Sequence, residues 1–421
     1  MAGLTIAEPQ AGRRELEPDV ARRLRVCMVH YSDFHTDSRL QRQAAAIIDR
    51  GGQVDCVCLS PSGQVVVAGG SVRLHGIALE RRRTGPLAYL GGYLRFLAQA
   101  TARVALLDRR RRFDLVEAHN MPDALVLAGL APRLRGAPVV LNLHDTFPEL
   151  FETTVGRGSS SLVRRLVRAE ERLSAVFAAG LIVVTPEARE RLASRGIGRG
   201  RTEVVMNSPD EGVFGAPREP ARWVRGTPLR AIYHGGLAER FGPDVLIGAF
   251  GLLRAGPRDI TLTVHGADEG RERVAALALE RAPDAVRVSP GAVAFHRIPG
   301  QLAAHHVGIV PTLRDPFTEL LLPVKLLEYV HMGLPVVAAR LPVIEGYFGD
   351  DEITWFEPGS AEALADALVA VHDDFEGARQ RAQRASAKLQ RLAWPAQRAR
   401  YLAMLDRLVT ASRRRRPTER G

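Results

Sequence analysis

The sequence predicts an α/β protein of two doubly wound parallel-sheet domains, each Rossmann-like, which face each other across a cleft. With 421 residues the chain is too long for one hydrophobic core and suits two domains. Short apolar runs alternate with longer amphipathic stretches, the β-α-β pattern of a parallel sheet covered on both faces. Polar residues follow several of these runs, at the sheet edge where open α/β sheets bind ligands.

The first β-α-β series predicts an N-terminal domain over residues 24–210. It begins with an apolar run at 25–29, an amphipathic helix at 38–50 and a second apolar run at 54–59. Further elements are expected as strands at 114–118, 139–143 and 181–184 and as a helix at 162–177.

A segment rich in Pro, Gly and Arg at residues 211–228 interrupts this pattern and is the expected interdomain linker. A second series then predicts a C-terminal domain over residues 229–395. Its strands are expected at 230–233, 261–264, 307–310, 335–338 and 353–356. Residues 396–412 are expected to form a C-terminal helix that packs back toward the N-terminal domain.

The composition favours a folded soluble enzyme whose surface attracts anions. Hydrophobic residues make up 46% of the chain and charged residues 25%. The formal net charge of +11 suits polyanions such as nucleic acid, anionic lipid or nucleotide phosphates. Nearly all of this positive charge is arginine, since only Lys325 and Lys388 are lysines.

The cysteines and the apolar runs predict a cytoplasmic protein. Cys27, Cys56 and Cys58 are too few for the disulfide framework of a small secreted protein, which indicates a reducing compartment. The first twenty-five residues contain no apolar run, so we expect no signal peptide. No stretch reaches about eighteen uninterrupted apolar residues either, so we expect no transmembrane helix.

The stretch at residues 322–337 is the strongest sign of a ligand site. A proline opens a short helix, Gly333 ends it, and an apolar strand follows. A helix N-terminus offers free N–H groups and a positive dipole end, which suit a diphosphate. Lys325 adds a full charge in the first turn, and Glu328 on the same face could accept hydrogen bonds from ribose hydroxyls. The alternative is an ordinary surface ion pair between these two side chains.

A second stretch, residues 233–240, runs from a strand directly into a glycine pair. Gly235 and Gly236 would let the backbone approach a phosphate closely, and Arg240 could reach the same anion. The alternative is a plain tight turn.

These residues together resemble the retaining family-four glycosyltransferases of the GT-B fold, as found in bacteria, over residues 24–412. Besides the two stretches above, five motifs carry the resemblance: Asp37-Ser38-Arg39, His119-Asn120-Met121-Pro122-Asp123, His144-Asp145-Thr146-Phe147-Pro148-Glu149, Asn207-Ser208-Pro209-Asp210 and Trp394-Pro395. The resemblance implies transfer of a sugar from a nucleotide-diphosphate donor to a hydroxyl acceptor, with retention of configuration by a front-face route.

The resemblance also implies roles for individual residues. Arg240 and Lys325 would neutralise the donor pyrophosphate, and Glu328 would hold the donor ribose. Of the first domain, His119 would project toward the donor sugar and take part in catalysis with Arg240 and Lys325. The acceptor side of the cleft would be built by Asp37, Arg39, Asn120, His144, Asp145 and Glu149.

One position departs from the family pattern. Many members carry a glutamate eight residues before the ribose-binding one, where it touches hydroxyls of the donor sugar, and that position here is Leu320. The neighbouring Glu319 is displaced by one residue. We therefore expect the donor sugar to be contacted by backbone amides near Leu321 and Val324, which leaves the identity of the sugar open.

We expect a reaction without a metal or a cofactor. Metal-dependent glycosyltransferases of the other common fold use an Asp-x-Asp triplet, and the sequence contains none. Positioned cations can instead stabilise the leaving diphosphate. The nucleotide base is not readable from the motifs, and uridine is the commonest choice.

A basic and apolar stretch at residues 81–112 raises the question of a membrane. Arginines at 81–83 and 109–112 flank a segment rich in Leu, Ala, Tyr and Phe, which would suit the headgroup layer of an anionic membrane. The acceptor would then be a lipid-linked sugar used in surface polysaccharide synthesis at the inner face of the plasma membrane. Alternatively the apolar face packs into the core, and the acceptor is a soluble molecule such as a natural-product aglycone.

Two other classes of protein share some of these sequence features. A sugar-nucleotide epimerase could share the architecture, because fold alone does not fix function, and product analysis with and without an acceptor distinguishes it. A nucleic-acid binder is not expected, because the arginine runs lack interleaved aromatic residues and no nucleic-acid-binding module is recognised.

Overall fold

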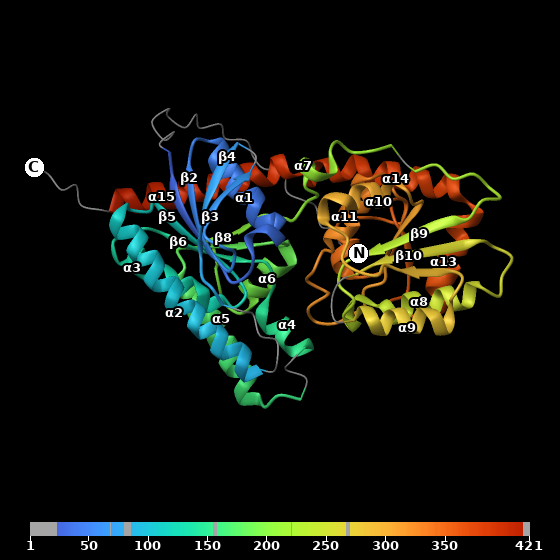
Figure 1. Ribbon diagram of the computed structural model, residues 1–421, viewed down its shortest axis with the longest axis horizontal. Helices are drawn as coiled ribbons and strands as arrows, with labels where there is room; N and C mark the ends of the chain where they lie inside the picture. Colours follow the sequence, from blue (N-terminus) through green and yellow to red (C-terminus); the bar gives the residue numbers. More distant parts are fainter. Residues whose placement is uncertain are drawn as a thin grey trace, which may run out of the picture.

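The structure, a computed structural model, describes residues 23–67, 69–79, 86–154, 158–219, 221–266 and 270–415. Two largely parallel sheets, each with helices on both faces, lie side by side along the long axis of the molecule (Figure 1). The predicted fold class of two doubly wound domains is therefore confirmed. The predicted arginine cluster at 81–83 and most of the N-terminal segment examined for a signal peptide lie outside the described residues.

Over the described residues the first sheet has eight strands in the order β3-β4-β2-β1-β5-β6-β7-β8, of which only the pair β3 and β4 is antiparallel. Its central strand β1 (Arg25–His30) is buried along its whole length. Met28 on β1 lies opposite Cys56 on one side and Glu117 on the other. The other parallel strands are β2 (Gln53–Cys58), β5 (Leu115–His119), β6 (Val139–Leu143), β7 (Gly180–Val183) and β8 (Thr202–Val204).

Four strands were not predicted, and they share one property: none is a long buried run. β3 (Gly63–Val67) and β4 (Gly70–Gly76) form an edge hairpin in which Val66 is 85% exposed. β8 and β11 (Val286–Val288) have three residues each and also lie at sheet edges. Edge strands need not carry continuous apolar residues, so they gave no signal of the kind that marked the central strands.

The helices of the first half cover both faces of the sheet. Val26 and Met28 on β1 pack toward α1 (Ser38–Asp49) and α15 (Trp394–Arg415). The alternate residues Cys27 and Val29 pack on the other face. That face is covered by α2 (Pro86–Arg110), the 3₁₀ helix η3 (Asp123–Gly129), α3 (Leu130–Leu134), α5 (Ser161–Phe177) and α6 (Pro186–Ser194).

Residues 86–110 of the basic and apolar stretch form α2, and one face of this helix packs into the core, as the alternative interpretation expected. Tyr93, Phe96 and Val104 are buried against the first sheet. Leu94 and Leu106 on the opposite side are exposed. Of the helices in the described part of the chain, none is long and apolar enough to cross a membrane.

In the part of the chain that the structure describes, the second sheet has six parallel strands in the order β11-β10-β9-β12-β13-β14. Its strands besides β11 are β9 (Leu229–His234), β10 (Ile260–His265), β12 (Val307–Val310), β13 (Val336–Ala339) and β14 (Thr354–Phe356). One face carries α8 (Pro243–Leu253), α9 (Arg271–Arg281) and α13 (Ala361–Asp373) (Figure 1). The other carries α10 (Ile298–Ala303), α11 (Val324–His331) and α14 (Phe375–Leu389).

The chain passes from the first half to the second through α7 (Glu211–Phe214) and an irregular segment that is fixed to the end of α11. The amide of Arg218 donates to the carbonyl of His331 at 2.9 Å, and that of Ala221 to the carbonyl of Gly333 at 2.9 Å. Gly333 has φ +71°, and a Cβ there would lie 2.4 Å from the Glu219 carbonyl. Only glycine fits this contact, so the segment at 211–228 is bound to the second half.

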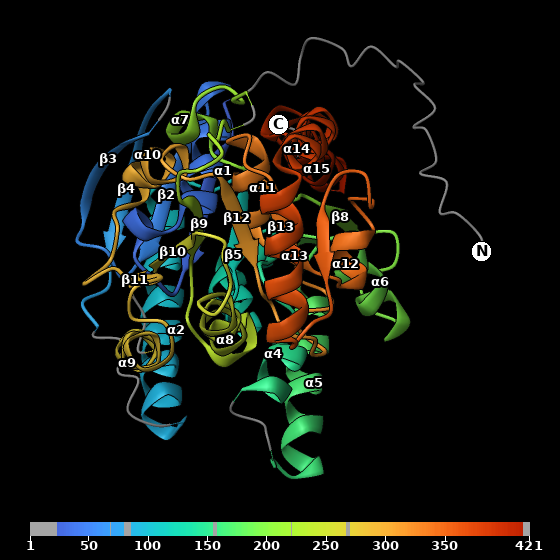
Figure 2. The same ribbon diagram turned by 90° about the vertical axis from the view of Figure 1, so that its right-hand side faces the viewer.

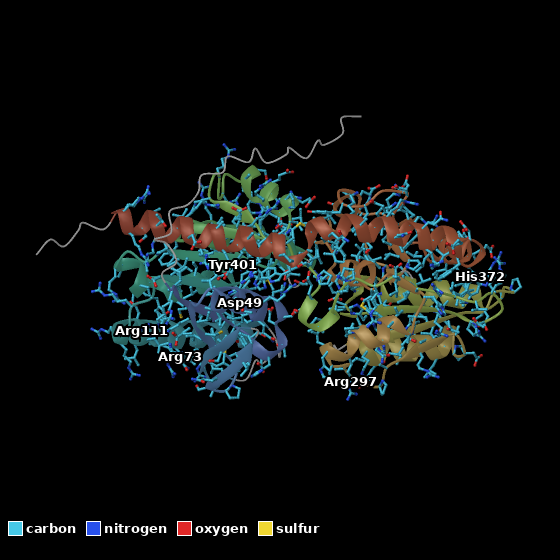
Figure 3. The ribbon with its side chains drawn as sticks, turned by 90° about the horizontal axis from the view of Figure 1, so that it is seen from above. Asp49, Arg73, Arg111, Arg297, His372 and Tyr401 are labelled. Carbon is cyan, nitrogen blue, oxygen red and sulfur yellow. The ribbon has the colours of Figure 1, made fainter. Side chains whose placement is uncertain are left out.

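The chain returns to the first half in α15. The Tyr401 hydroxyl donates to Glu117 Oε2 at 2.6 Å, in the middle of the first sheet. Arg398 pairs with Asp49 at 3.1 Å and Asp406 with Arg50 at 2.6 Å. Figure 3 shows α15 lying over this half, with Tyr401 and Asp49 labelled. Helix α15 is therefore part of the N-terminal half of the molecule.

Candidate donor and acceptor site

The glycine pair after β9 forms a turn that accommodates a lysine. The amide of Gly235 donates to the carbonyl of His265 at 3.0 Å, and its φ is +124°. A Cβ at this position would lie 3.0 Å from the Lys325 Nζ. A glycine is therefore needed both for the backbone conformation and for the close approach of the ammonium group.

Lys325 lies in the first turn of α11, and aromatic side chains fix its ammonium group. Its Nζ donates to the Tyr233 hydroxyl at 2.9 Å and lies 4.1 Å from the centre of the Tyr233 ring and 5.1 Å from that of Phe241. The Tyr233 hydroxyl in turn donates to the carbonyl of Gly236. A full positive charge thus stands over a glycine turn beside a helix N-terminus, an arrangement that suits a phosphate.

Glu328 lies one turn further along α11 and is buried. Its Oε2 is 3.1 Å from His234 Nε2, while the His234 amide donates to the Tyr329 hydroxyl at 3.1 Å. His234 ends β9 immediately before the glycine turn. The structure therefore brings Lys325, Glu328 and the glycine turn together at the carboxyl edge of the second sheet.

Arg240 connects the two halves of the molecule. It lies on the 3₁₀ helix η4 (Glu239–Phe241), and its Nη1 donates to the Thr153 hydroxyl at 3.0 Å on α4 (Phe147–Thr153) of the first half. Its guanidinium carbon also lies 5.4 Å from the centre of the Phe317 ring. Arg240 is thus placed at the cleft, within reach of both halves.

The loop before α11 is internally braced. Asp315 Oδ1 accepts the amides of Phe317 and Thr318 at 2.8 and 2.7 Å. The Leu321 amide donates to the Thr318 carbonyl at 3.3 Å, so this amide is used within the loop, whereas Val324 is the first residue of α11. The carbonyl of Leu320 accepts the Thr185 hydroxyl of the first half at 3.0 Å.

A small pocket of about 10 Å³ lies between this loop and the strand ends of the first half. From the first half it is lined by Leu143, His144, Asp145, Thr146, Val183, Val184 and Ala188, and from the second by Phe317, Leu320 and Leu321. Leu320, which stands where the family carries a glutamate, thus contributes an apolar surface to the space between the halves.

On the first half, Asp37 is the centre of a charged cluster. It caps α1 by accepting the amides of Arg39 and Leu40 at 3.0 and 3.2 Å, and its Oδ2 is 3.5 Å from His30 and 3.9 Å from His144. Burial acts to raise the pKa of the Asp37 carboxyl, but the charge of Arg39, the two histidines and the capping amides outweigh it and lower the pKa. Asp37 is therefore a carboxylate at neutral pH.

His119 and His144 are joined by a hydrogen bond. The His119 Nδ1 and the His144 Nε2 are 3.0 Å apart, and both rings are buried. Burial lowers the pKa of His119 to about 3 and lowers that of His144 strongly. Both imidazoles are neutral at physiological pH. The His119 ring is fully covered, so its expected contact with the donor sugar stays a prediction.

Comparison with known proteins shows the family of the chain. Residues 36–208 match the model of the glycosyl transferase 4-like domain, and residues 228–374 match that of the glycosyl transferases group 1. The chain is a family-four-type glycosyltransferase with the GT-B fold. It uses a nucleotide-sugar donor.

Relatives of this glycosyltransferase are distant. A D-inositol 3-phosphate glycosyltransferase of Paenarthrobacter aurescens is 26% identical over 353 residues, which cover 79% of this chain and 83% of that protein. Sucrose-phosphate synthase from Thermosynechococcus elongatus is 17% identical, with a TM-score of 0.73 over 92% of this chain and 100% of that chain. HepE from Anabaena, solved with UDP-glucose, is 16% identical, with a TM-score of 0.63 over 92% and 99%. The solved structures show the fold alone.

Asn120 and Asp145 are tied together at the strand ends of the glycosyltransferase. Asn120 Nδ2 donates to the Asp145 carbonyl at 2.7 Å and to Asp123 at 2.9 Å, and its Oδ1 accepts the His144 amide at 2.8 Å. Burial raises the pKa of the Asp145 carboxyl, and the charges of Arg39 and Arg240 offset this only in part. Asn120 thus holds the backbone of His144 and Asp145 in position.

Glu149 is placed differently from the other predicted acceptor-side residues of the glycosyltransferase. Its buried carboxylate contacts Arg195 and lies 3.6 Å from the Nε of Arg191. Arg195 also bonds Glu171 of α5 at 2.9 Å. These contacts link α4 to α5 and α6, so Glu149 has a structural role, and its expected contact with the acceptor stays a prediction.

Sequence reasoning missed Glu117, a fully buried carboxyl in the middle of β5. It accepts the Tyr401 hydroxyl at 2.6 Å and the Asn142 side-chain amide at 2.8 Å, and its Oε1 is 3.8 Å from His119 Nε2. Burial raises the pKa of Glu117 to about 7, against the effect of both hydrogen bonds. The only signal in the sequence was a charged residue inside an apolar strand run.

The described residues of the glycosyltransferase contain no group of three or more His, Cys, Asp or Glu side chains placed to hold a metal ion. The adjacent His305 and His306 are used structurally. His305 lies 2.9 Å from the Thr263 hydroxyl, and His306 accepts the Arg230 amide at 3.0 Å.

Proposed function

We propose that this glycosyltransferase takes a UDP-sugar as its donor and transfers the sugar to a hydroxyl acceptor with retention of configuration, without a metal ion or cofactor. The observation that carries the proposal is the cradle formed by the Gly235 turn, the Lys325 ammonium and Glu328 at the edge of the second sheet. This cradle offers a cation for a diphosphate and a carboxylate for ribose hydroxyls within one helix turn.

The cationic side chains of the site stabilise the leaving group in the proposed reaction. The bond between the anomeric carbon and the diphosphate oxygen lengthens, and negative charge builds up on the leaving diphosphate. Lys325 and Arg240 stabilise this charge, since both are held by neighbours before the reaction begins. The acceptor oxygen bonds to the anomeric carbon on the same face, and the departing diphosphate takes up the hydroxyl proton.

The uridine nucleotide is supported by likeness only. HepE, which shares the fold over most of this chain, was solved with UDP and with UDP-glucose. Glu328 and Lys325 would contact the ribose and the phosphates, which all nucleotide sugars share, so the base must be selected elsewhere. A choice between UDP, GDP and dTDP is therefore a direct test of this part of the proposal.

For the acceptor we propose a lipid-linked sugar of surface polysaccharide synthesis, used at the inner face of the plasma membrane. A phosphorylated polyol is the second candidate, favoured by the curated relatives named D-inositol 3-phosphate glycosyltransferase. Arg39, with a side chain 33% exposed, stands on the acceptor side and would meet the phosphate. Activity assays with inositol phosphate and with a polyprenyl-linked sugar distinguish the two candidate acceptors.

The first experiment measures binding of UDP-, GDP- and dTDP-sugars by calorimetry. We expect one nucleotide class to bind the wild type, and we expect Lys325→Ala and Glu328→Ala each to weaken it roughly tenfold or more. Lys388→Ala is the matched control, because Lys388 is the only other lysine and pairs with Glu352 on the surface. Unchanged binding in both site variants would refute the donor site.

A turnover assay tests the remaining parts. NMR of the product reports whether the anomeric configuration of the donor is retained, and inversion would refute the front-face route. Treatment with a chelator should leave the rate unchanged. A rate that falls on chelation and recovers with added Mg²⁺ or Mn²⁺ would refute the proposed metal independence.

A further inference from the structure

Helix α5 shows its apolar side to the solvent. Leu162, Leu166, Leu173 and Val176 recur at helical spacing on one face, and their side chains are between 61% and 70% exposed. Ala169, in the same stripe, is exposed as well. In a surface helix the apolar stripe ordinarily faces the core. On α5 it is instead Glu171, Ser174 and Ala175 that face inward.

The same exposure continues over the neighbouring elements. α2 contacts η3 and α3, and α5 contacts η3, so the four elements form one layer on the first sheet. Figure 2 shows α2 and α5 extending together beyond the rest of the first half. Along this layer further leucines are between 40% and 79% exposed: Leu90, Leu94, Leu106, Leu127, Leu130 and Leu134. So much exposed leucine on one layer is typical of an interaction surface.

In this layer the acidic side chains are turned inward, whereas most of the arginines are exposed. The carboxyl groups of Asp108, Asp123 and Glu171 are buried, and Glu170 turns inward to accept the Ala124 amide. The exposed charges beside the leucines are arginines: Arg95, Arg109, Arg110, Arg133, Arg165 and Arg172. A second copy of this chain would bring two arginine-rich surfaces together, which is unfavourable. An apolar surface edged by arginine is matched by an anionic lipid bilayer.

We propose that the layer formed by α2, η3, α3 and α5 is the surface by which this protein docks on an anionic membrane, with α5 as its main apolar contact. The leucines would enter the headgroup region while the arginines bind lipid phosphates. α4 contacts α5 and carries Thr153, which bonds Arg240 across the cleft. Docking would therefore bring the acceptor side of the cleft close to the bilayer. Only this last step rests on the proposed function, because docking itself requires no donor.

The test is co-sedimentation of the full-length protein with vesicles of phosphatidylcholine alone or mixed with phosphatidylglycerol. We expect binding to the mixed vesicles that weakens as salt is added. The double variant Leu166→Glu with Leu173→Glu should lower the partition coefficient at least about tenfold, and Arg165→Gln with Arg172→Gln should do so roughly to the same extent. The matched control is Leu252→Glu with Leu279→Glu, whose leucines are 50% and 71% exposed on the second half.

Several outcomes would overturn the proposal: equal binding to neutral and anionic vesicles, no binding at all, or the same loss in the control as in the α5 variants. A dimer that dissociates when Leu166 and Leu173 are changed would show that the layer is an interface between copies. Nucleotide binding by the same variants is measured in parallel. If a variant loses vesicle binding but binds nucleotide normally, only the membrane surface has been affected. If the proposed donor site is wrong, vesicle binding by the wild type is unaffected.

Discussion

The proposed donor side and the proposed acceptor side of the cleft are built in different ways. On the second half, Lys325, Glu328 and the Gly235 turn come from two short stretches of sequence, and each side chain has its own local partner. On the first half, Asp37 lies beside two histidines, one of which bonds His119, which in turn lies near Glu117 and through it Tyr401 of the last helix. A change on the donor side should stay local, whereas one on the acceptor side should spread through buried groups.

The largest effect is expected for Lys325→Ala, and it tests whether the donor side is separable from stability. Removing the ammonium group should lower kcat/KM at least about 100-fold, because in the proposed reaction this group stabilises the negative charge on the leaving diphosphate. The melting temperature should hardly move, since the Lys325 side chain is half-buried and rests on an aromatic surface that remains. Steady-state kinetics beside thermal unfolding would check this. A large loss of stability would break the comparison.

The next effect concerns pH and the acceptor side. The pKa of Glu117 is about 7 in the folded protein, above its usual value near 4.3. A carboxyl whose pKa is raised by folding adds stability below its unfolded pKa, and this contribution is lost as pH rises through the folded pKa. From about pH 5.5 to pH 8 the wild type should therefore lose roughly 2 kcal/mol through this group.

Glu117→Gln removes this titration, so its free energy of unfolding should be flatter over the same pH range. Urea unfolding at several pH values measures the slope for both proteins. Donor binding by the variant should be unchanged, because Glu117 lies on the first sheet. Equal slopes in variant and wild type would mean that Glu117 does not titrate in this range.

The smallest effect is expected for Gly235→Ala, which tests the close fit between the glycine turn and Lys325 on the donor side. The new Cβ would meet the Lys325 ammonium in a backbone conformation that L side chains rarely adopt. We expect donor affinity to fall roughly tenfold, with a loss of stability of about 1 kcal/mol. Gly291→Ala is the control, because its φ is ordinary and nothing lies within 4 Å of the added atom. Equal affinities of the two variants would contradict the proposed fit.

The sequence predicted those elements and residues whose signal lies within a short stretch of the chain. The strand expected at 307–310 is β12 to the residue, because a central parallel strand is buried on both faces and reads as one apolar run. Lys325 and Glu328 share a helix face, so their spacing alone brought them together. Edge strands such as β3 left no such run.

The interpretation of single side chains was limited by long-range packing. Glu149 was grouped with the acceptor side because it follows His144 in a motif, and nothing in that motif shows that its carboxylate also contacts Arg195, forty-six residues later. Glu117 finds its partner Tyr401 at a separation of 284 residues. The exposed face of α5 was equally hidden, since periodicity reveals an apolar stripe but not the direction in which it points.

The chain crosses between the halves twice, once through the segment at 211–228 and once where α15 begins at Trp394. Arg42 stands beside both crossings: it donates to the Ser208 carbonyl and lies 5.2 Å from the Trp394 ring. We therefore expect opening of the cleft to bend the chain at these two crossings, next to Arg42.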